Sequence, residues 1–206
     1  MAFQAGLLNS KKAESLRCAY KEGQPFPHMV IQDVMQDDFL RQVRSEIIRN
    51  LRFKFDENKV YRIQRSTHLA NISNPDEYTP ELLPNLTQLR DALNGSEFRA
   101  WVSNITGVGP LSGTRSSMAV NMYLPGDHLL THDDCNPKSR NRRLSFILYL
   151  TDPDEPWLPE ASLCPATATS AKEPTSLLHL PSTRHPASGF TESAEQTTSI
   201  LLNRRS

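Results

Sequence analysis

The chain has 206 residues, of which 23 are basic and 23 acidic, and 37% are hydrophobic. This length suffices for one domain with a hydrophobic core and is short for two. The balanced charge gives no argument for binding nucleic acid or a membrane surface, and no apolar run approaches the roughly 18 residues of a membrane span. Three widely spaced cysteines give neither a disulfide framework nor a zinc-binding pattern. We therefore expect a soluble, intracellular protein.

Helical periodicity dominates the first half of the chain. The clearest case begins at Asp37 or Asp38, because Leu40, Val43 and Ile47 recur at steps of three and four residues. Capping residues mark three further helices, one with Ser10 as the expected cap and another with Ser96. The four predicted helices cover residues 10–22, 37–51, 86–93 and 96–105.

Strand patterns lie between and after these helices. Residues 53–55 and 60–63 flank a polar segment and predict a hairpin. Residues 120–124 alternate between apolar and polar or smaller side chains before a turn at 125–127, and residues 143–150 form the most apolar run of the chain. Because the helices precede the main strands, the order favours an α+β fold in which helices brace an antiparallel sheet.

A possible metal-binding pattern lies between the last two strands. His132 and Asp134 are two residues apart at the end of an extended segment, so that their side chains share one face. Such a pair supplies two of the three ligands of the 2-His-1-carboxylate triad of non-haem Fe(II) oxygenases. The alternative interpretation is a polar loop with a solvated histidine, which the spacing alone does not exclude.

Several longer strings extend this pattern and point to a known family. They are N-M-Y at 121–123, H-L-L-T-H-D-D at 128–134 and R-R-L-S-F-I-L-Y-L at 142–150, with Y-R-I-Q at 61–64, L-A-N at 69–71 and L-P-N-L at 83–86 upstream. Over roughly residues 28 to 157 the chain resembles the Fe(II)- and 2-oxoglutarate-dependent prolyl hydroxylases that modify a ribosomal protein, also called the termination-and-polyadenylation protein family.

The resemblance implies a fold, a site and a function. The fold is a double-stranded β-helix, a jelly-roll with iron at one open end. His132 and Asp134 match the first two iron ligands, and Tyr123 and Tyr149 match tyrosines that contact 2-oxoglutarate. The implied activity is hydroxylation of a prolyl residue in a small-subunit ribosomal protein, with Fe(II), 2-oxoglutarate and ascorbate as cofactors. The implied partners include translation termination factors, and the implied location is the nucleus or cytoplasm.

The pattern of this family does not continue beyond Trp157. A second iron-binding histidine and an arginine for the cosubstrate follow in the family, whereas this chain offers only His179 and His185, neither with an arginine at strand spacing. Of the 49 residues 158–206, 20 are Ser, Thr or Pro, a composition typical of disorder. We therefore predict an extension at 1–24, a partial oxygenase domain at 25–157 and a disordered tail at 158–206. We also expect the 206-residue chain to be an incomplete, inactive form.

Two other functions are consistent with the same residues. One is a non-catalytic, translation-associated interaction protein that retains part of this fold. The other is a metal phosphohydrolase of the His-Asp type, which the strand-like surroundings of His132 disfavour because such ligands normally lie on helices. Formation of succinate from 2-oxoglutarate in the presence of iron separates the enzyme from the interaction protein.

Overall fold

A computed structural model of the chain describes residues 2–24, 26–73, 80–130, 132, 142–150, 177–179 and 194–203. The described helices are α1 (Ser10–Glu22), α2 (Asp37–Asn50), α3 (Pro84–Asn94) and α4 (Ser96–Thr106), with short 3-10 turns η1 (Leu69–Ser73) and η2 (Pro80–Leu82). The described strands are β1 (Val30–Gln32), β2 (Phe53–Glu57), β3 (Tyr61–Ser66), β4 (Leu111–Tyr123), β5 (His128–Leu129), β6 (Arg142–Tyr149), β7 (Leu177–His179) and β8 (Ala194–Asn203).

The four predicted helices are confirmed, with small changes at their ends. Asn9 rather than Ser10 caps α1, since the Asn9 side chain accepts a hydrogen bond from the Lys11 N–H. Gly95 is the N-cap of α4, so that Ser96 is its first helical residue, and Gly107 ends this helix in the left-handed conformation at φ 71°. Asparagine, serine and glycine all occur at N-cap positions. Where two such residues are adjacent, as at Asn9–Ser10 and Gly95–Ser96, the sequence does not show which of them begins the helix.

Glu46 of α2 has a role that the helical pattern did not predict. Its position suggested an outward-facing residue, but its carboxylate accepts hydrogen bonds from the backbone N–H groups of Asn85 (3.1 Å) and Leu86 (2.9 Å). These groups belong to the first turn of α3, whose N-cap residue, Leu83, supplies no side-chain hydrogen bond. A carboxylate at this position satisfies unpaired donors and complements the helix dipole. Glu46 therefore links α2 to α3.

The segment predicted as an N-terminal extension packs into the core. Helix α1 lies along α4, where the Arg17 guanidinium donates to the Asn104 carbonyl oxygen at 2.9 Å. Leu7 is fully buried, and the Phe3 ring stacks on the Phe98 ring with 5.2 Å between centroids. Residues 2–24 thus contribute apolar surface to the same core as the helices that follow.

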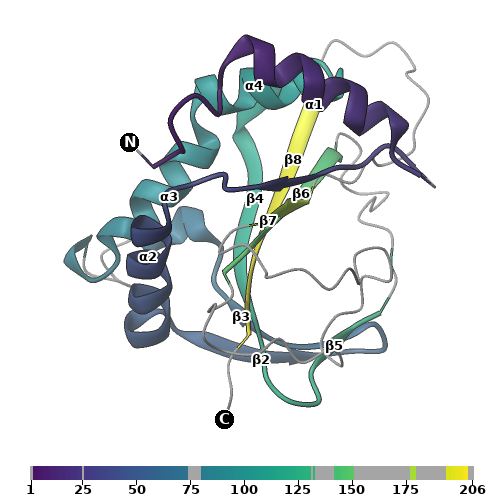
Figure 1. Ribbon diagram of the computed structural model, residues 1–206. Helices are drawn as coiled ribbons and strands as arrows, with labels where there is room; N and C mark the ends of the chain where they lie inside the picture. The colour runs from purple at the N-terminus through teal and green to yellow at the C-terminus, as the bar shows by residue number, and fades with distance from the viewer. Residues whose placement is uncertain are drawn as a thin grey trace.

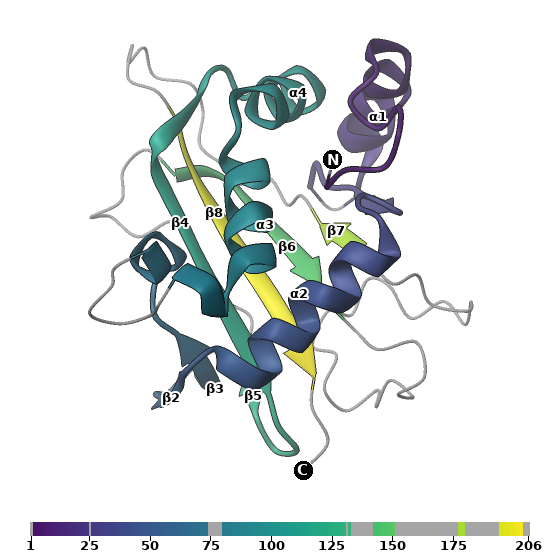
Figure 2. The same cartoon turned by 90° about the vertical axis from the view of Figure 1, so that its left-hand side faces the viewer.

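One sheet contains all the described strands. Its order is β1-β7-β6-β8-β4-β3-β2, and β5 pairs with β3 beside this path. The hairpin predicted around residues 56–59 is confirmed, because β2 and β3 pair from Phe53–Ser66 to Glu57–Arg62. Helices α2 and α3 lie across one face of the sheet, and α1 and α4 lie at one end of its long strands (Figures 1 and 2). The predicted α+β class is confirmed at this level.

Two strands come from the range predicted to be a disordered tail. Strand β7 pairs with β6 through Tyr149–Leu177, Leu148–Leu178 and Ile147–His179, and β8 lies between β4 and β6. The structure describes only these two segments of the range 158–206, so the disorder expected of the tail stays a prediction. Composition measures what a segment can bury by itself, whereas β7 and β8 gain backbone hydrogen bonds from strands formed elsewhere in the chain. Consequently β6 is paired along both edges.

The direction of β8 differs from the antiparallel pairing that was expected throughout. β8 runs parallel to both β4 and β6. Parallel and antiparallel ladders both satisfy backbone N–H and C=O groups, so a segment inserted between two parallel neighbours can pair in either direction. The sheet is therefore mixed.

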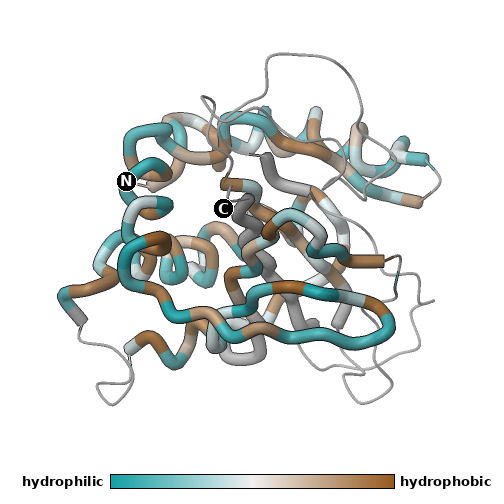
Figure 3. Tube along the Cα trace, turned by 90° about the horizontal axis from the view of Figure 1, so that it is seen from below, coloured by the Kyte–Doolittle hydropathy of each residue, from teal (hydrophilic) through white to brown (hydrophobic). Residues whose placement is uncertain are grey.

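The two faces of the sheet have different side chains. Met118, Val120 and Met122 of β4 are buried in one core cluster with the helices, together with Leu144, Phe146, Leu148 and Leu150 of the β6 region. Asn121 and Tyr123 alternate with these residues in β4 and so lie on the opposite face. The same alternation of apolar and polar residues is visible along the β2–β3 hairpin, which is nearest the viewer in Figure 3. Among the described helices, none is long and apolar enough to cross a membrane.

Candidate active site

His132 follows β5 at the margin of the sheet. Strand β5 pairs with β3 through Tyr61–Leu129 and Arg62–His128, and the Leu130 N–H then donates to the Val60 carbonyl at 2.8 Å. The His132 side chain is exposed, and its Nδ1 lies 2.9 Å from the Leu130 carbonyl oxygen. With Nδ1–H as the donor, the lone pair of the imidazole is on Nε2. Metal-binding histidines are commonly oriented in this way, by a carbonyl that accepts from the other ring nitrogen.

The remaining predicted metal ligand lies outside the described residues. Asp134 is in the undescribed stretch 133–141, as is His185 in 180–193, and only the backbone pairing of His179 is described. Within the described ranges, no group of three or more His, Cys, Asp or Glu side chains could hold a metal ion. His132 is thus the one predicted ligand with a side-chain contact described here, and its role as a metal ligand stays a prediction.

Tyr123 is the last residue of β4 and is partly buried. Burial is the largest cause of the raised pKa of its phenol, which is about 12. The charge of the Arg65 guanidinium lowers this pKa, and the charge of the Asp127 carboxylate raises it. A phenol with this pKa keeps its proton at neutral pH and can donate a hydrogen bond to a carboxylate. The environment of Tyr123 therefore suits the role that the resemblance implies for it.

Tyr149 lies on the same sheet face as Tyr123. It is the last residue of β6 and pairs with Leu201 of β8, whereas Tyr123 pairs with Asn203. Positions 201 and 203 are two apart in one strand and therefore share a face, and paired residues of neighbouring strands lie on the same face as each other. The register thus brings both tyrosines to the face away from the helices, with one strand between them.

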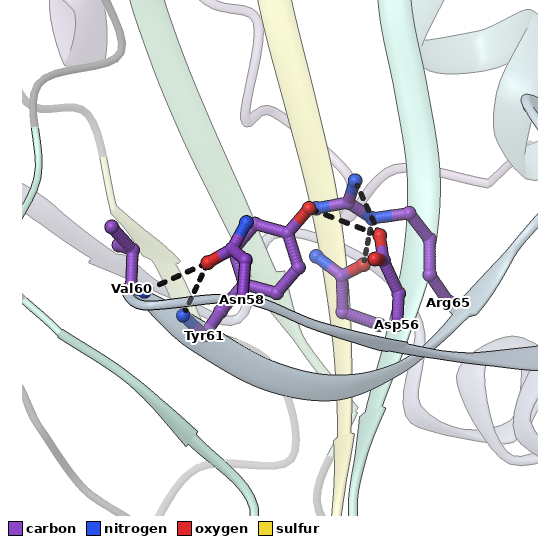
Figure 4. A network of polar contacts seen from close by, with 6 residues as sticks. Asp56, Asn58, Val60, Tyr61 and Arg65 are labelled. Carbon is purple, nitrogen blue, oxygen red and sulfur yellow. Dashed lines mark hydrogen bonds and ion pairs between the residues drawn. The ribbon is translucent and has the colours of Figure 1, made fainter.

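A polar network on this face was not predicted from the sequence. The Arg65 guanidinium lies over the Tyr61 ring, 5.1 Å from its centroid, and Nη1 is 3.5 Å from Asp56 Oδ2. Its Nε donates to Asn121 Oδ1 at 3.4 Å, and the Tyr61 hydroxyl donates to Asp56 Oδ2 at 3.0 Å (Figure 4). We call Asp56, Tyr61, Arg65 and Asn121 the hairpin network. The alternation of Tyr61, Ile63 and Arg65 in a strand was the available signal, but it does not reveal the pairing with β2 and β4.

Arg62 forms a second set of contacts on the other face of the hairpin. Its Nε is 3.4 Å from Asp127 Oδ1, and its guanidinium lies over the Phe55 ring at 5.5 Å. The Asp127 side chain is only 4% exposed, and Oδ2 also accepts from the Leu124 N–H at 3.0 Å. Asp127 therefore fixes the turn after β4, where the sequence predicted turn residues, and Arg62 balances its buried charge.

Comparison with known proteins finds relatives of this chain, although no protein-family model matches it. The chain is 38% identical over 134 residues to the prolyl 3,4-dihydroxylase OGFOD1 of Ostreococcus tauri, covering 65% of this chain and 25% of that protein. It is 35% identical over 127 residues to the prolyl 3-hydroxylase OGFOD1 of Mus musculus, covering 61% and 20%. The chain is thus similar in sequence to two proteins named OGFOD1 prolyl hydroxylases over 61–65% of its length.

A third relative extends the same result to another lineage. The chain is 25% identical over 142 residues to the prolyl 3-hydroxylase sudestada1 of Drosophila melanogaster, covering 68% of this chain and 24% of that protein. All three relatives are named as prolyl hydroxylases, so the resemblance stated from the sequence is confirmed. The chain spans about a quarter or less of the length of each of these relatives.

Proposed function

We propose that the chain carries part of the active site of an Fe(II)- and 2-oxoglutarate-dependent prolyl hydroxylase with a double-stranded β-helix core. The observation that carries this proposal is the common sheet face of Tyr123 and Tyr149, with His132 directly after β5. The similarity to three named prolyl hydroxylases supports it independently. The substrate would be a prolyl residue of a small-subunit ribosomal protein, in the nucleus or cytoplasm and in association with translation termination.

Each candidate residue has a distinct role in this proposal. His132, through Nε2, and Asp134 would hold the iron, which together with 2-oxoglutarate and O₂ supplies the oxidation of a prolyl C–H bond. Tyr123 and Tyr149 would donate hydrogen bonds from their hydroxyls to the cosubstrate. The Tyr123 hydroxyl is protonated at neutral pH, as in any tyrosine with a pKa of 10 or above, and can therefore donate. Ascorbate would keep the metal reduced.

The experiment measures metal binding and turnover separately. Mn(II), a spectroscopic substitute for Fe(II), is titrated into the 206-residue chain, and succinate is then measured with Fe(II), 2-oxoglutarate and ascorbate. We expect His132→Ala to weaken Mn(II) binding by at least about tenfold. The matched control is His128→Ala, because His128 lies in β5 and pairs with Arg62.

A chimaera tests turnover when the 206-residue chain forms no succinate. In the chimaera, the C-terminal portion of an OGFOD1-type relative replaces residues 158–206. We expect it to form succinate and to lose this activity with His132→Ala. Mn(II) binding that is unaffected by His132→Ala, together with no succinate from the chimaera, would favour the non-catalytic interaction protein instead.

A further inference from the structure

The hairpin network contains a positive and a negative group that are both accessible. The Arg65 side chain is 42% exposed and the Asp56 side chain is 41% exposed, although their nearest N···O distance is 3.5 Å. The described contacts of Arg65 use Nε and Nη1, and those of Asp56 use Oδ2. Within the described part of the chain, Arg65 Nη2 and Asp56 Oδ1 have no hydrogen-bonding partner. The pair therefore retains both donor and acceptor capacity.

The rest of the network holds these two groups in position. The Tyr61 hydroxyl donates to Asp56, and the Tyr61 ring lies against the Arg65 guanidinium. Asn121, which is buried, contacts Arg65 from the neighbouring strand. Two turn contacts hold Tyr61 in place as well, because Asn58 Oδ1 accepts from the backbone N–H groups of Val60 (2.7 Å) and Tyr61 (3.0 Å) (Figure 4). A binding group held in this way loses little conformational freedom when a ligand arrives.

The charge of the pair indicates which ligand it suits. Arg65 and Asp56 sum to zero, and an isolated anion that approached Arg65 would also meet the Asp56 carboxylate. A peptide unit has no net charge and offers one carbonyl acceptor and one N–H donor. A hydrogen bond from a guanidinium to a peptide carbonyl, or from a peptide N–H to a carboxylate, has one charged partner and is stronger than a bond between two neutral groups. A peptide main chain therefore satisfies both members of the pair.

The position of the pair relates it to the candidate site. Arg65 pairs with Asn121 in the β3–β4 ladder, and Tyr123 is two residues beyond Asn121 on the same face. Asp56 pairs with Ile63, which also alternates onto this face with Arg65. A chain bound at the pair would thus lie one strand away from Tyr123, on the face that is not covered by helices.

We propose that Arg65 and Asp56 form a subsite that binds one peptide unit of the polypeptide substrate, Arg65 donating to its carbonyl oxygen and Asp56 accepting from its N–H. The inference rests on the proposed function, since it assigns the substrate-binding residues of that site. Both residues are positioning residues, because they hold the substrate and do not touch the atoms that react.

The experiment begins with peptide binding and requires no turnover. An array of 15-residue peptides that tile the small-subunit ribosomal proteins identifies the tightest binder, whose Kd is measured by fluorescence anisotropy with the 206-residue chain. We expect Arg65→Met to raise this Kd by about tenfold or more, as the loss of one hydrogen bond to a charged group predicts. The matched control is Arg49→Met, which removes an exposed guanidinium from α2 on the helix-covered side and should change the Kd less than about twofold.

A backbone substitution in the peptide identifies the contact with Asp56. N-methylation at each position in turn removes one N–H, and at one position we expect the Kd of the wild-type protein to rise by about tenfold. The same N-methyl group should have little effect on the Asp56→Ala protein, because its partner is already absent. A purely structural role of Asp56 would weaken all peptides equally and would not show this coupling.

The outcomes separate this inference from the proposed function. An array without a binder, or an Arg65→Met protein that binds the peptide as tightly as the wild type, overturns the subsite even where succinate is formed. A weaker affinity for 2-oxoglutarate with unchanged peptide affinity also overturns it, because Arg65 would then serve the cosubstrate. Peptide binding that depends on Arg65 and Asp56, without any succinate from the chimaera, supports the subsite and counts against the proposed reaction.

Discussion

The two faces of the sheet are built from the same strands, but only one of them is covered by helices. On the helix-covered face, β4 and β6 contribute a continuous apolar surface in which Val120, Phe146 and Leu148 are fully buried. On the other face, the same two strands present Asn121, Tyr123 and Tyr149. Residues one position apart in a strand thus serve the core and the candidate site, respectively.

Arg62 and Arg65 lie on opposite faces of β3, and their ion pairs differ as the two faces of the sheet do. Arg62 and Arg65 have similar side-chain exposure, 49% and 42%, and each is next to an aspartate. The partner of Arg62, Asp127, is buried and also fixes a turn, whereas the partner of Arg65, Asp56, is 41% exposed. Arg62 also lies 4.0 Å from the exposed Glu57, so the difference is that Arg62 has a buried carboxylate partner, whereas both members of the Arg65–Asp56 pair are accessible.

The largest effect is expected from the helix-covered face. Phe146→Ala should lower the free energy of unfolding by about 3–5 kcal/mol, because it removes a fully buried ring that packs edge-on against Phe98 with 5.8 Å between centroids. Urea denaturation measures the change. Ile147→Ala, on the opposite face and only partly buried, is the control and should cost less. Equal losses for the two variants would remove the distinction between the faces.

On the site face we expect loss of function without loss of stability. His132→Ala should reduce the turnover of the chimaera by at least 10–100-fold, since even residues that only orient a metal ligand have effects of this size. The free energy of unfolding should change by no more than about 0.5 kcal/mol, because the His132 side chain is exposed. Succinate assays and urea denaturation of the same protein preparation give both values. A His132→Ala protein with normal turnover would place the metal elsewhere.

An intermediate effect is expected where two helices of the covered face meet. Glu46→Ala leaves the Asn85 and Leu86 N–H groups without their carboxylate partner and should lower the free energy of unfolding by about 1–2 kcal/mol. Arg49→Ala, an exposed residue of the same helix, is the control and should change it by less than about 0.5 kcal/mol. Thermal unfolding measures both. The same small shift for both variants would show that the capping contact contributes little.

The smallest effect should be confined to alkaline pH. Burial raises the pKa of Tyr123 to about 12, above its ordinary value near 10. Between these values the unfolded chain loses the phenolic proton while the folded protein retains it, so the contribution of Tyr123 to stability is complete below pH 10 and declines as pH rises toward 12. Urea denaturation at several pH values should show a shallower decline for Tyr123→Phe than for the wild type. Identical profiles would mean that Tyr123 is more solvated than its position indicates.

Local patterns were sufficient to predict the helices and the first hairpin. In α2 the spacing of Leu40, Val43 and Ile47, with Asp37 at the start and Arg49 at the end, is enough to define the element and its buried side. The hairpin follows similarly from short strands around a polar turn. These features depend on residues close together in sequence, and they do not require knowledge of the sheet.

Features that depend on strand pairing were not predictable in the same way. The contact between Arg65 and Asn121 joins residues 56 positions apart, and β8 pairs with β4 and β6 across comparable or longer separations, as in Val120–Ile200 and Leu148–Ile200. Of the candidate site, His132 and Asp134 came from spacing, Tyr123 and Tyr149 came from the resemblance, and Asp56 and Arg65 required the register. Strands β7 and β8 could not be predicted in this way, because composition describes a segment without the strands that pair with it.

The central position of β8 has a consequence for synthesis on the ribosome. Strands β4 and β6 emerge first, and the strand that lies between them is translated last among the described elements. At roughly 5–20 residues per second, several seconds pass between the exit of Tyr149 and that of Ala194. During this interval the facing edges of β4 and β6 have unpaired N–H and C=O groups, which can pair with other nascent chains. The yield of folded protein should therefore depend on translation speed and on chaperones that cover strand edges.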